Sequence, residues 1–64
     1  MWIAVDIDGS VYMYTQKPIR TTECWMPALE DLNEPIEVNR SKAKAIAGRV
    51  LNWSDEPIKL NKNA

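Results

Sequence analysis

The sequence predicts a small α+β domain in which a three- to four-stranded, mainly antiparallel sheet carries one packed helix. Three observations lead to this class. A β-hairpin signal stands near the start, one amphipathic helix pattern follows the middle, and 64 residues can bury only one thin core. Hydrophobic content of 45% and charged content of 27% are typical of a folded domain. We expect one domain over residues 1–60 and a frayed tail over 61–64.

The hairpin is predicted by two runs of alternating β-forming residues, 2–7 and 11–15, on either side of Asp8-Gly9. This dipeptide favours a two-residue type I′ turn, which would pair Val5 with Tyr12. Successive side chains of a strand point to opposite faces, so this register decides which residues meet the core. The face expected to pack on the core carries Ile3, Val5, Ile7, Tyr12 and Tyr14. The opposite face includes Trp2 and Met13 and is too apolar for full solvation, so we expect another segment to cover part of it.

The helix is predicted over residues 40–51, where small and branched apolar residues recur at helical spacing. Asn39 or Ser41 can serve as its N-cap and Asn52 as the residue that follows its end. Gly48 falls inside this span, where it costs about 1 kcal/mol relative to alanine. The apolar stripe consists of Ala43, Ile46, Ala47, Val50 and Leu51, and we expect it to lie on the sheet.

Shorter elements are expected where a proline precedes or ends a run of β-forming residues. Lys17-Pro18 ends the hairpin because proline cannot donate to a sheet ladder. The segments that follow are predicted as a third strand at 21–26, a helical turn or loop at 28–33, and short strands at 36–38 and 58–60.

Composition excludes several classes of site. The chain has no histidine and one cysteine, Cys24, so an intrachain disulfide, a structural zinc site and a Cys-His nucleophile all lack their residues. We therefore expect no metal and no cofactor. The sequence has neither a signal-peptide pattern nor an apolar run of about 18 residues, which predicts a cytoplasmic protein without a membrane partner.

The segment from Ile3 to Val11 resembles the first motif of the haloacid dehalogenase superfamily, a hydrophobic strand followed by D-x-D-G-T. The resemblance implies a nucleophile at Asp6 and a general acid and base at Asp8, with Mg²⁺ bridging to phosphate. That family needs a doubly wound sheet, which so short a chain cannot build. Phosphatase-like chemistry is therefore a remote alternative, and we expect a protein that is not an enzyme.

Charge is segregated along the chain, although the net charge is only −1. An acidic stretch without a basic residue contains Glu30, Asp31, Glu34 and Glu37, and a basic stretch without an acidic one contains Arg40, Lys42, Lys44 and Arg49. The simplest interpretation is a solvated surface whose two halves attract each other. The basic stretch could instead contact nucleic-acid phosphates, but its side chains spread over both flanks of the helix stripe. Nucleic-acid association is the first alternative function.

The two ends of the chain together resemble small, mostly uncharacterised proteins of bacteriophages and prophages. Their opening reads roughly W-I-A-x-D-x-D-G-S-L-x-L-Y-x-x-K-P-x-R and their ending W-x-D-E-P-x-x-V/L. Here residues 2–20 supply the opening and residues 53–60 the ending, while the helix at 40–51 departs from those proteins, which usually have a short loop there. The resemblance implies an accessory protein acting in the bacterial cytoplasm, with no catalytic residues to carry over.

Size, the absence of a catalytic constellation and three tryptophans favour non-catalytic binding. Together with the phage resemblance they imply binding of a host or phage protein, which could inhibit or modulate a host process. The candidate surface combines the second hairpin face, the exit from the hairpin and the ending. Its residues are Trp2, Met13, Lys17, Arg20 and Trp53. A homodimer that buries this surface is the competing partner.

Overall fold

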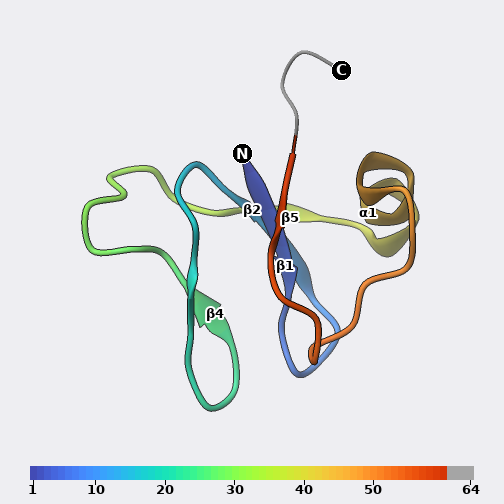
Figure 1. Ribbon diagram of the computed structural model, residues 1–64, viewed down its shortest axis with the longest axis horizontal. Coiled ribbons are helices and arrows are strands. Elements are labelled where there is room, and N and C mark those ends of the chain that lie inside the picture. Colours follow the sequence, from blue (N-terminus) through green and yellow to red (C-terminus); the bar gives the residue numbers. More distant parts are fainter. Residues whose placement is uncertain (61–64) are drawn as a thin grey trace.

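Two antiparallel sheets and one helix make up the fold in the computed structural model, which describes residues 1–60 (Figure 1). The main sheet has four strands in the order β5-β2-β1-β6, and the second sheet pairs β3 with β4. This arrangement confirms the predicted α+β class, and the tail predicted at 61–64 lies outside the described residues. The elements are β1 (Trp2–Val5), β2 (Val11–Tyr14), β3 (Ile19–Arg20), β4 (Trp25–Met26), β5 (Ile36–Val38), α1 (Arg40–Ala47) and β6 (Ile58–Lys59).

The β1–β2 hairpin forms where it was predicted, but its register is shifted by one residue. Val5 pairs with Val11, and not with Tyr12. The Asp6 N–H donates to the Ser10 carbonyl (2.8 Å) and the Gly9 N–H to the Asp6 carbonyl (2.9 Å). Gly9 has φ 92°, and no residue other than glycine has positive φ in the described chain. The loop is thus a three-residue turn with glycine last, which requires positive φ once, whereas a type I′ turn requires it twice.

This register exchanges the two faces of β2 relative to the prediction. Ile3 now lies opposite Met13, and Ala4 lies opposite Tyr12. Ile7, predicted to face the core, is exposed in the turn. The helix face of the hairpin therefore carries Ile3, Val5, Val11 and Met13, and the tryptophan face carries Trp2, Ala4, Tyr12 and Tyr14.

The predicted strand at 21–26 is wrong over most of its length, because the segment forms a second, very short hairpin. Thr21 closes its turn: its N–H donates to the Cys24 carbonyl (2.8 Å), and its Oγ1 accepts from the Cys24 N–H (3.1 Å). Only Trp25–Met26 continues as a strand, paired with β3. A threonine whose hydroxyl bonds the local backbone favours a turn over an extended chain. Residues 28–33, predicted as a helical turn or a loop, form a loop. The short strand predicted at 36–38 is confirmed as β5, and the one predicted at 58–60 is confirmed as β6 except for its last residue.

Helix α1 begins as predicted and ends four residues early. The Asn39 side chain accepts from the Lys42 N–H (2.8 Å), which selects Asn39 as the N-cap. At the other end Gly48 has φ 83° and donates to the Lys44 carbonyl (2.8 Å), so it is the C-cap and Asn52 is not. Glycine reaches this left-handed conformation without strain, which explains why the helix stops there.

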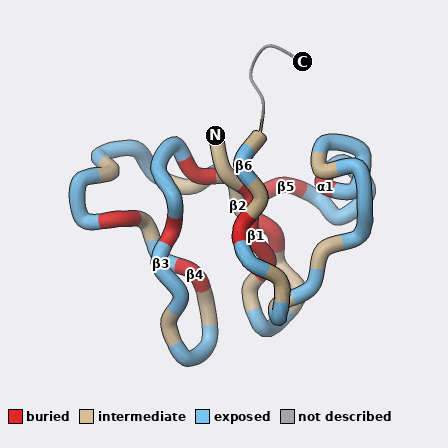
Figure 2. The backbone as a smooth tube through the Cα atoms, viewed as in Figure 1, coloured by how far each residue is buried: buried red, intermediate tan, exposed pale blue. Residues whose placement is uncertain are grey.

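Both faces of the β1–β2 hairpin are covered, as the apolar second face had indicated. In Figure 1 the sheet stands between α1 on the right and β3–β4 on the left, and Figure 2 shows the buried segments along β1, β2 and β4. On the helix face, α1 contributes Ala43 to a buried cluster with Ile3, Val5, Val11 and Val38. On the tryptophan face, Trp25 joins Ala4 and Tyr14, and Trp2, Tyr12 and Trp53 pack around them. Trp25 is thus a core residue.

Candidate functional site

An arginine held between two tryptophans forms the centre of the tryptophan face. The Arg20 guanidinium carbon lies 4.3 Å from the centroid of the Trp25 ring and 4.4 Å from that of Trp53. The two rings meet edge to face, with centroids 6.1 Å apart. A planar, weakly hydrated guanidinium is suited to such stacking, which joins β3, β4 and the segment before β6.

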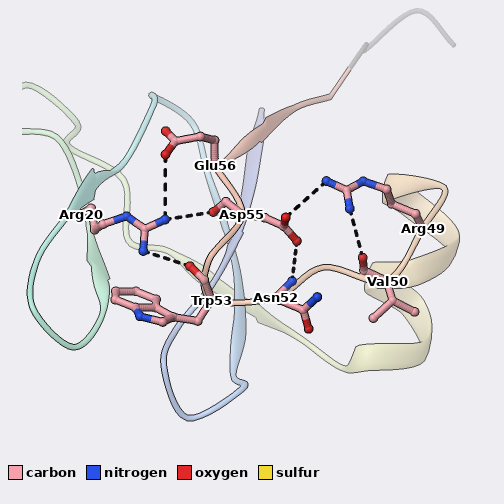
Figure 3. A network of polar contacts seen from close by, with 7 residues as sticks. All are labelled: Arg20, Arg49, Val50, Asn52, Trp53, Asp55 and Glu56. Atoms are coloured by element: carbon pink, nitrogen blue, oxygen red, sulfur yellow. Dashed lines mark hydrogen bonds and ion pairs between the residues drawn. The ribbon is translucent and has the colours of Figure 1, made fainter.

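The same guanidinium binds the backbone of the chain's ending (Figure 3). Its Nη1 donates to the Trp53 carbonyl (2.9 Å) and its Nη2 to the Asp55 carbonyl (3.1 Å). Glu56 lies 4.0 Å from Nη2, on the same side. Arg20 therefore fixes the segment 53–56, and the exit from the first hairpin and the ending of the chain form one structural unit.

Asp55 extends this network toward α1 (Figure 3). One carboxylate oxygen accepts from the Asn52 N–H (2.8 Å), and the other lies 3.7 Å from Arg49 Nη2. The Asp55 N–H in turn donates to the Asn52 carbonyl (3.0 Å). The segment 52–56 therefore forms a turn that is held by its own hydrogen bonds and by two arginines, Arg20 on one side and Arg49 on the other.

Tyr14 anchors the tryptophan face from within. Its buried hydroxyl donates to the Trp25 carbonyl (3.2 Å), and burial raises the pKa of this phenol well above its ordinary value. Tyr14 therefore stays neutral at physiological pH and serves packing.

The half-buried indole of Trp2 belongs to this face and has two exposed lysines near its ring. The Lys17 ammonium lies 5.7 Å and the Lys59 ammonium 5.9 Å from the Trp2 ring centroid. Lys59 was absent from the predicted site, although β6 pairs with β1 and places it opposite Trp2. An antiparallel pairing of the predicted strand 58–60 with the first strand could have located it. The resulting surface combines an aromatic ring with two free cations.

The structure brings together four of the five predicted site residues. Trp2, Lys17, Arg20 and Trp53 all lie on the tryptophan face. Met13 does not, because the one-residue register shift turns it toward the helix face, where it packs half-buried against the core. Arg20, Lys17 and Lys59 are exposed, and Trp2 and Trp53 are both half-buried.

The two aspartates of the D-x-D-G segment both bond the backbone. Asp6 Oδ1 accepts from the Trp25 N–H (2.9 Å), which ties the second hairpin to the first. Asp8 Oδ1 accepts from the Ser10 N–H (2.9 Å), and this bond lowers the pKa of the exposed Asp8 carboxyl. Both carboxylates thus have structural partners that account for their positions.

The four basic residues of the nucleic-acid alternative divide into two pairs. Arg40 Nε donates to the Gly9 carbonyl (3.1 Å), and Arg49 contacts Asp55 and the Val50 carbonyl. Lys42 and Lys44 are exposed and form no side-chain hydrogen bond or ion pair within residues 1–60. Only half of the basic stretch is therefore available for phosphate.

Two shallow hollows adjoin the helix side of the molecule, of about 300 and 380 Å³. Both are lined by Val5, Arg40 and Asn52, so Arg40 stands where they meet. The larger one also borders the D-x-D-G loop. Because Arg40 already donates to Gly9, its guanidinium closes the space between the hairpin loop and the chain after α1.

No family model, curated protein or solved structure matches this chain. Over residues 1–60, the structure contains no helix with the length and apolar content that crossing a membrane requires.

Proposed function

We propose that this chain is a small non-catalytic domain that binds another protein, from a bacteriophage or its bacterial host, in the bacterial cytoplasm. The observation that carries the proposal is the Trp2 surface, where the ammonium groups of Lys17 and Lys59 both lie within 6 Å of the centroid of a half-buried indole. Tryptophan supplies much of the binding free energy in many protein interfaces, and flanking cations select an acidic partner. The partner expected is a protein that presents an apolar side chain among carboxylates.

The rest of the tryptophan face supports this role. Arg20 is stacked on the rings of Trp25 and Trp53 and bonded to two carbonyls, which holds these two members of the cluster around Trp2 in one geometry. A surface that is ordered before binding loses less conformational entropy on association. The alternatives have less support, because Asp6 and Asp8 each hold a backbone N–H and two of the four helix cations are engaged within the chain.

Affinity capture from lysate of the bacterial host, read by mass spectrometry, tests the proposal with a matched pair of variants. Lys17→Glu/Lys59→Glu reverses both cations of the Trp2 surface and leaves the tryptophan packing in place. Lys42→Glu/Lys44→Glu makes the same change of charge on α1. We expect a protein that binds the wild type and the helix variant alike and binds the Trp2-surface variant at least about tenfold more weakly.

Two results would count against protein binding at this surface. One is that the wild type recovers no protein beyond those recovered by the Trp2-surface variant. The other is that the helix variant alone loses the captured material and that this material is nucleic acid, with an affinity that falls steeply with salt. Far-UV circular dichroism of all three proteins confirms that the substitutions leave the fold intact.

A further inference from the structure

The acidic loop, residues 28–34, displays two leucines at the edge of the molecule. Leu29 is 88% and Leu32 95% exposed, more than any other large apolar side chain of the described residues. Glu30 and Glu34 beside them are also exposed. Large apolar residues are normally buried, and apolar side chains grouped at one exposed site are characteristic of an interface.

The acidic loop holds these leucines in a fixed position. Asp31 accepts hydrogen bonds from the Thr15 hydroxyl (2.6 Å), the Gln16 N–H (3.2 Å) and the Asn33 N–H (3.0 Å). The Asp31 N–H donates to the carbonyl of Ala28, whose side chain is buried. The loop is thus tied to the end of β2 at its centre, and the two leucines stand within two residues of that tie along the chain. The leucines are therefore carried by a loop whose conformation is fixed by hydrogen bonds.

The outer side of α1 has the opposite charge. Ala45 and Ile46 are exposed there, and Lys42 and Lys44 lie on the two flanks of this side, because residues two apart on a helix do not point the same way. Residues spaced like Lys42 and Ile46 are neighbours on a helix surface. We call these four residues the helix patch, and it combines two free cations with a small apolar area.

The acidic loop and the helix patch cannot meet within one molecule. Figure 1 shows the loop at the left edge and α1 at the right edge, with both sheets between them. The ion pairs formed within residues 1–60 join Arg20 to Glu56 and Arg49 to Asp55, and neither links the acidic stretch to the basic one. Two complementary surfaces on opposite sides of one chain can satisfy each other only between copies.

We propose that this chain associates with itself head to tail, with the acidic loop of one copy seated on the helix patch of the next. The contact joins two different surfaces, so it propagates into short chains of molecules unless a ring closes. Because charged, exposed groups provide the complementarity, salt weakens it. Each contact is small, which predicts reversible association that depends on concentration. This interface is separate from the Trp2 surface and stands or falls independently of it.

Sedimentation of two variants and of their mixture tests the arrangement. Leu29→Ser/Leu32→Ser disables the acidic loop and leaves the helix patch intact; Lys42→Glu/Lys44→Glu does the reverse. All four positions are exposed, so folding is little affected. We expect the wild type to grow past the dimer with concentration at low salt and to dissociate at high salt. Each variant alone should stay monomeric, and an equimolar mixture should form a heterodimer that grows no further.

The mixture separates this arrangement from its competitors. A wild type that stays monomeric at every concentration overturns the proposal, and so does association that survives in both variants, which would place the contact elsewhere. A monomeric wild type whose loop variant loses a captured foreign protein also overturns it, because the occupant of the loop would then be that protein. Only the pattern of two inert variants that restore a dimer on mixing supports head-to-tail contact.

Discussion

At the scale of single residues, the aspartates that resembled a catalytic motif accept hydrogen bonds from the backbone of this small domain. Asp8 and Asp31 accept from backbone N–H groups in loops, Asp6 accepts from the N–H of Trp25 at the start of β4, and Thr21 closes the second hairpin. A chain of this size buries too little surface to leave its turns unsupported. The D-x-D-G segment is therefore explained by its role in the hairpin turn. Arg20 is explained by its contacts with the second hairpin and with the ending of the chain.

Arg20→Lys should destabilise the fold by about 1–2 kcal/mol, although it keeps the charge. Lysine lacks the planar group that stacks on Trp25 and Trp53 and the fork that reaches two carbonyls. Urea unfolding followed by tryptophan fluorescence measures the change. Glu56→Gln is the control, since Glu56 is 80% exposed at the limit of an ion pair and should cost less than about 0.5 kcal/mol. Equal effects of the two substitutions would contradict the stacked role of Arg20.

Asp31 should make stability depend on pH in the acid range. The Thr15 hydroxyl, followed by the Asn33 N–H, holds the pKa of this carboxyl below its ordinary value. The unfolded chain therefore binds the proton more readily, so the stabilisation is complete above the unfolded pKa of about 3.9 and is lost as pH falls toward the folded pKa. Urea midpoints measured from neutral to acid pH should fall less steeply for Asp31→Asn than for the wild type. Thr15→Val should flatten the same limb, and an unchanged slope in both variants would show that the contact is not formed.

At the scale of elements, the sequence located the β1–β2 hairpin and the start of α1, but it missed the register and the end of the helix. Asp8-Gly9 is compatible with either a two- or a three-residue turn, and only the backbone conformation of Asp8 separates them. Gly48 is equally compatible with a weak helix interior and a C-cap. The second sheet was missed because strands of two residues, as in β3 and β4, have no periodicity to detect.

The substitution Gly48→Ala distinguishes a helix that ends at Ala47 from one that continues to Leu51, because its effect on stability has opposite signs in the two cases. At φ 83° an alanine is strained, and nothing lies within 4 Å of the added methyl group, so the loss of about 1 kcal/mol arises from the backbone alone. Inside a longer helix the same substitution would stabilise by about 1 kcal/mol. Thermal unfolding followed by far-UV circular dichroism gives the sign. Gly48→Asn should cost less than Gly48→Ala, because asparagine tolerates the left-handed conformation better.

At the scale of the whole molecule, one hairpin serves two clusters. Ile3 and Val5 face α1, and Trp2 and Ala4 face the second sheet, so β1 cannot be displaced without opening both. The grouping of Trp2, Lys17, Arg20 and Trp53 could be anticipated from the hairpin, its exit and the ending of the chain. The exclusion of Met13 and the part played by Lys59 could not, because each depends on a register between strands.

This sharing predicts that the two sides of the sheet unfold together. All three tryptophans lie on one side and the helix on the other, so fluorescence and far-UV circular dichroism report on separate places. Their urea transitions should coincide, as in a two-state domain. Ala43→Gly weakens α1 on the helix face by about 1 kcal/mol and should shift the fluorescence midpoint as far as the dichroism midpoint, although Ala43 belongs to the other cluster. A variant in which the helix signal melts first while tryptophan fluorescence is unchanged would mean that the clusters are independent, and that the Trp2 surface keeps its shape without α1.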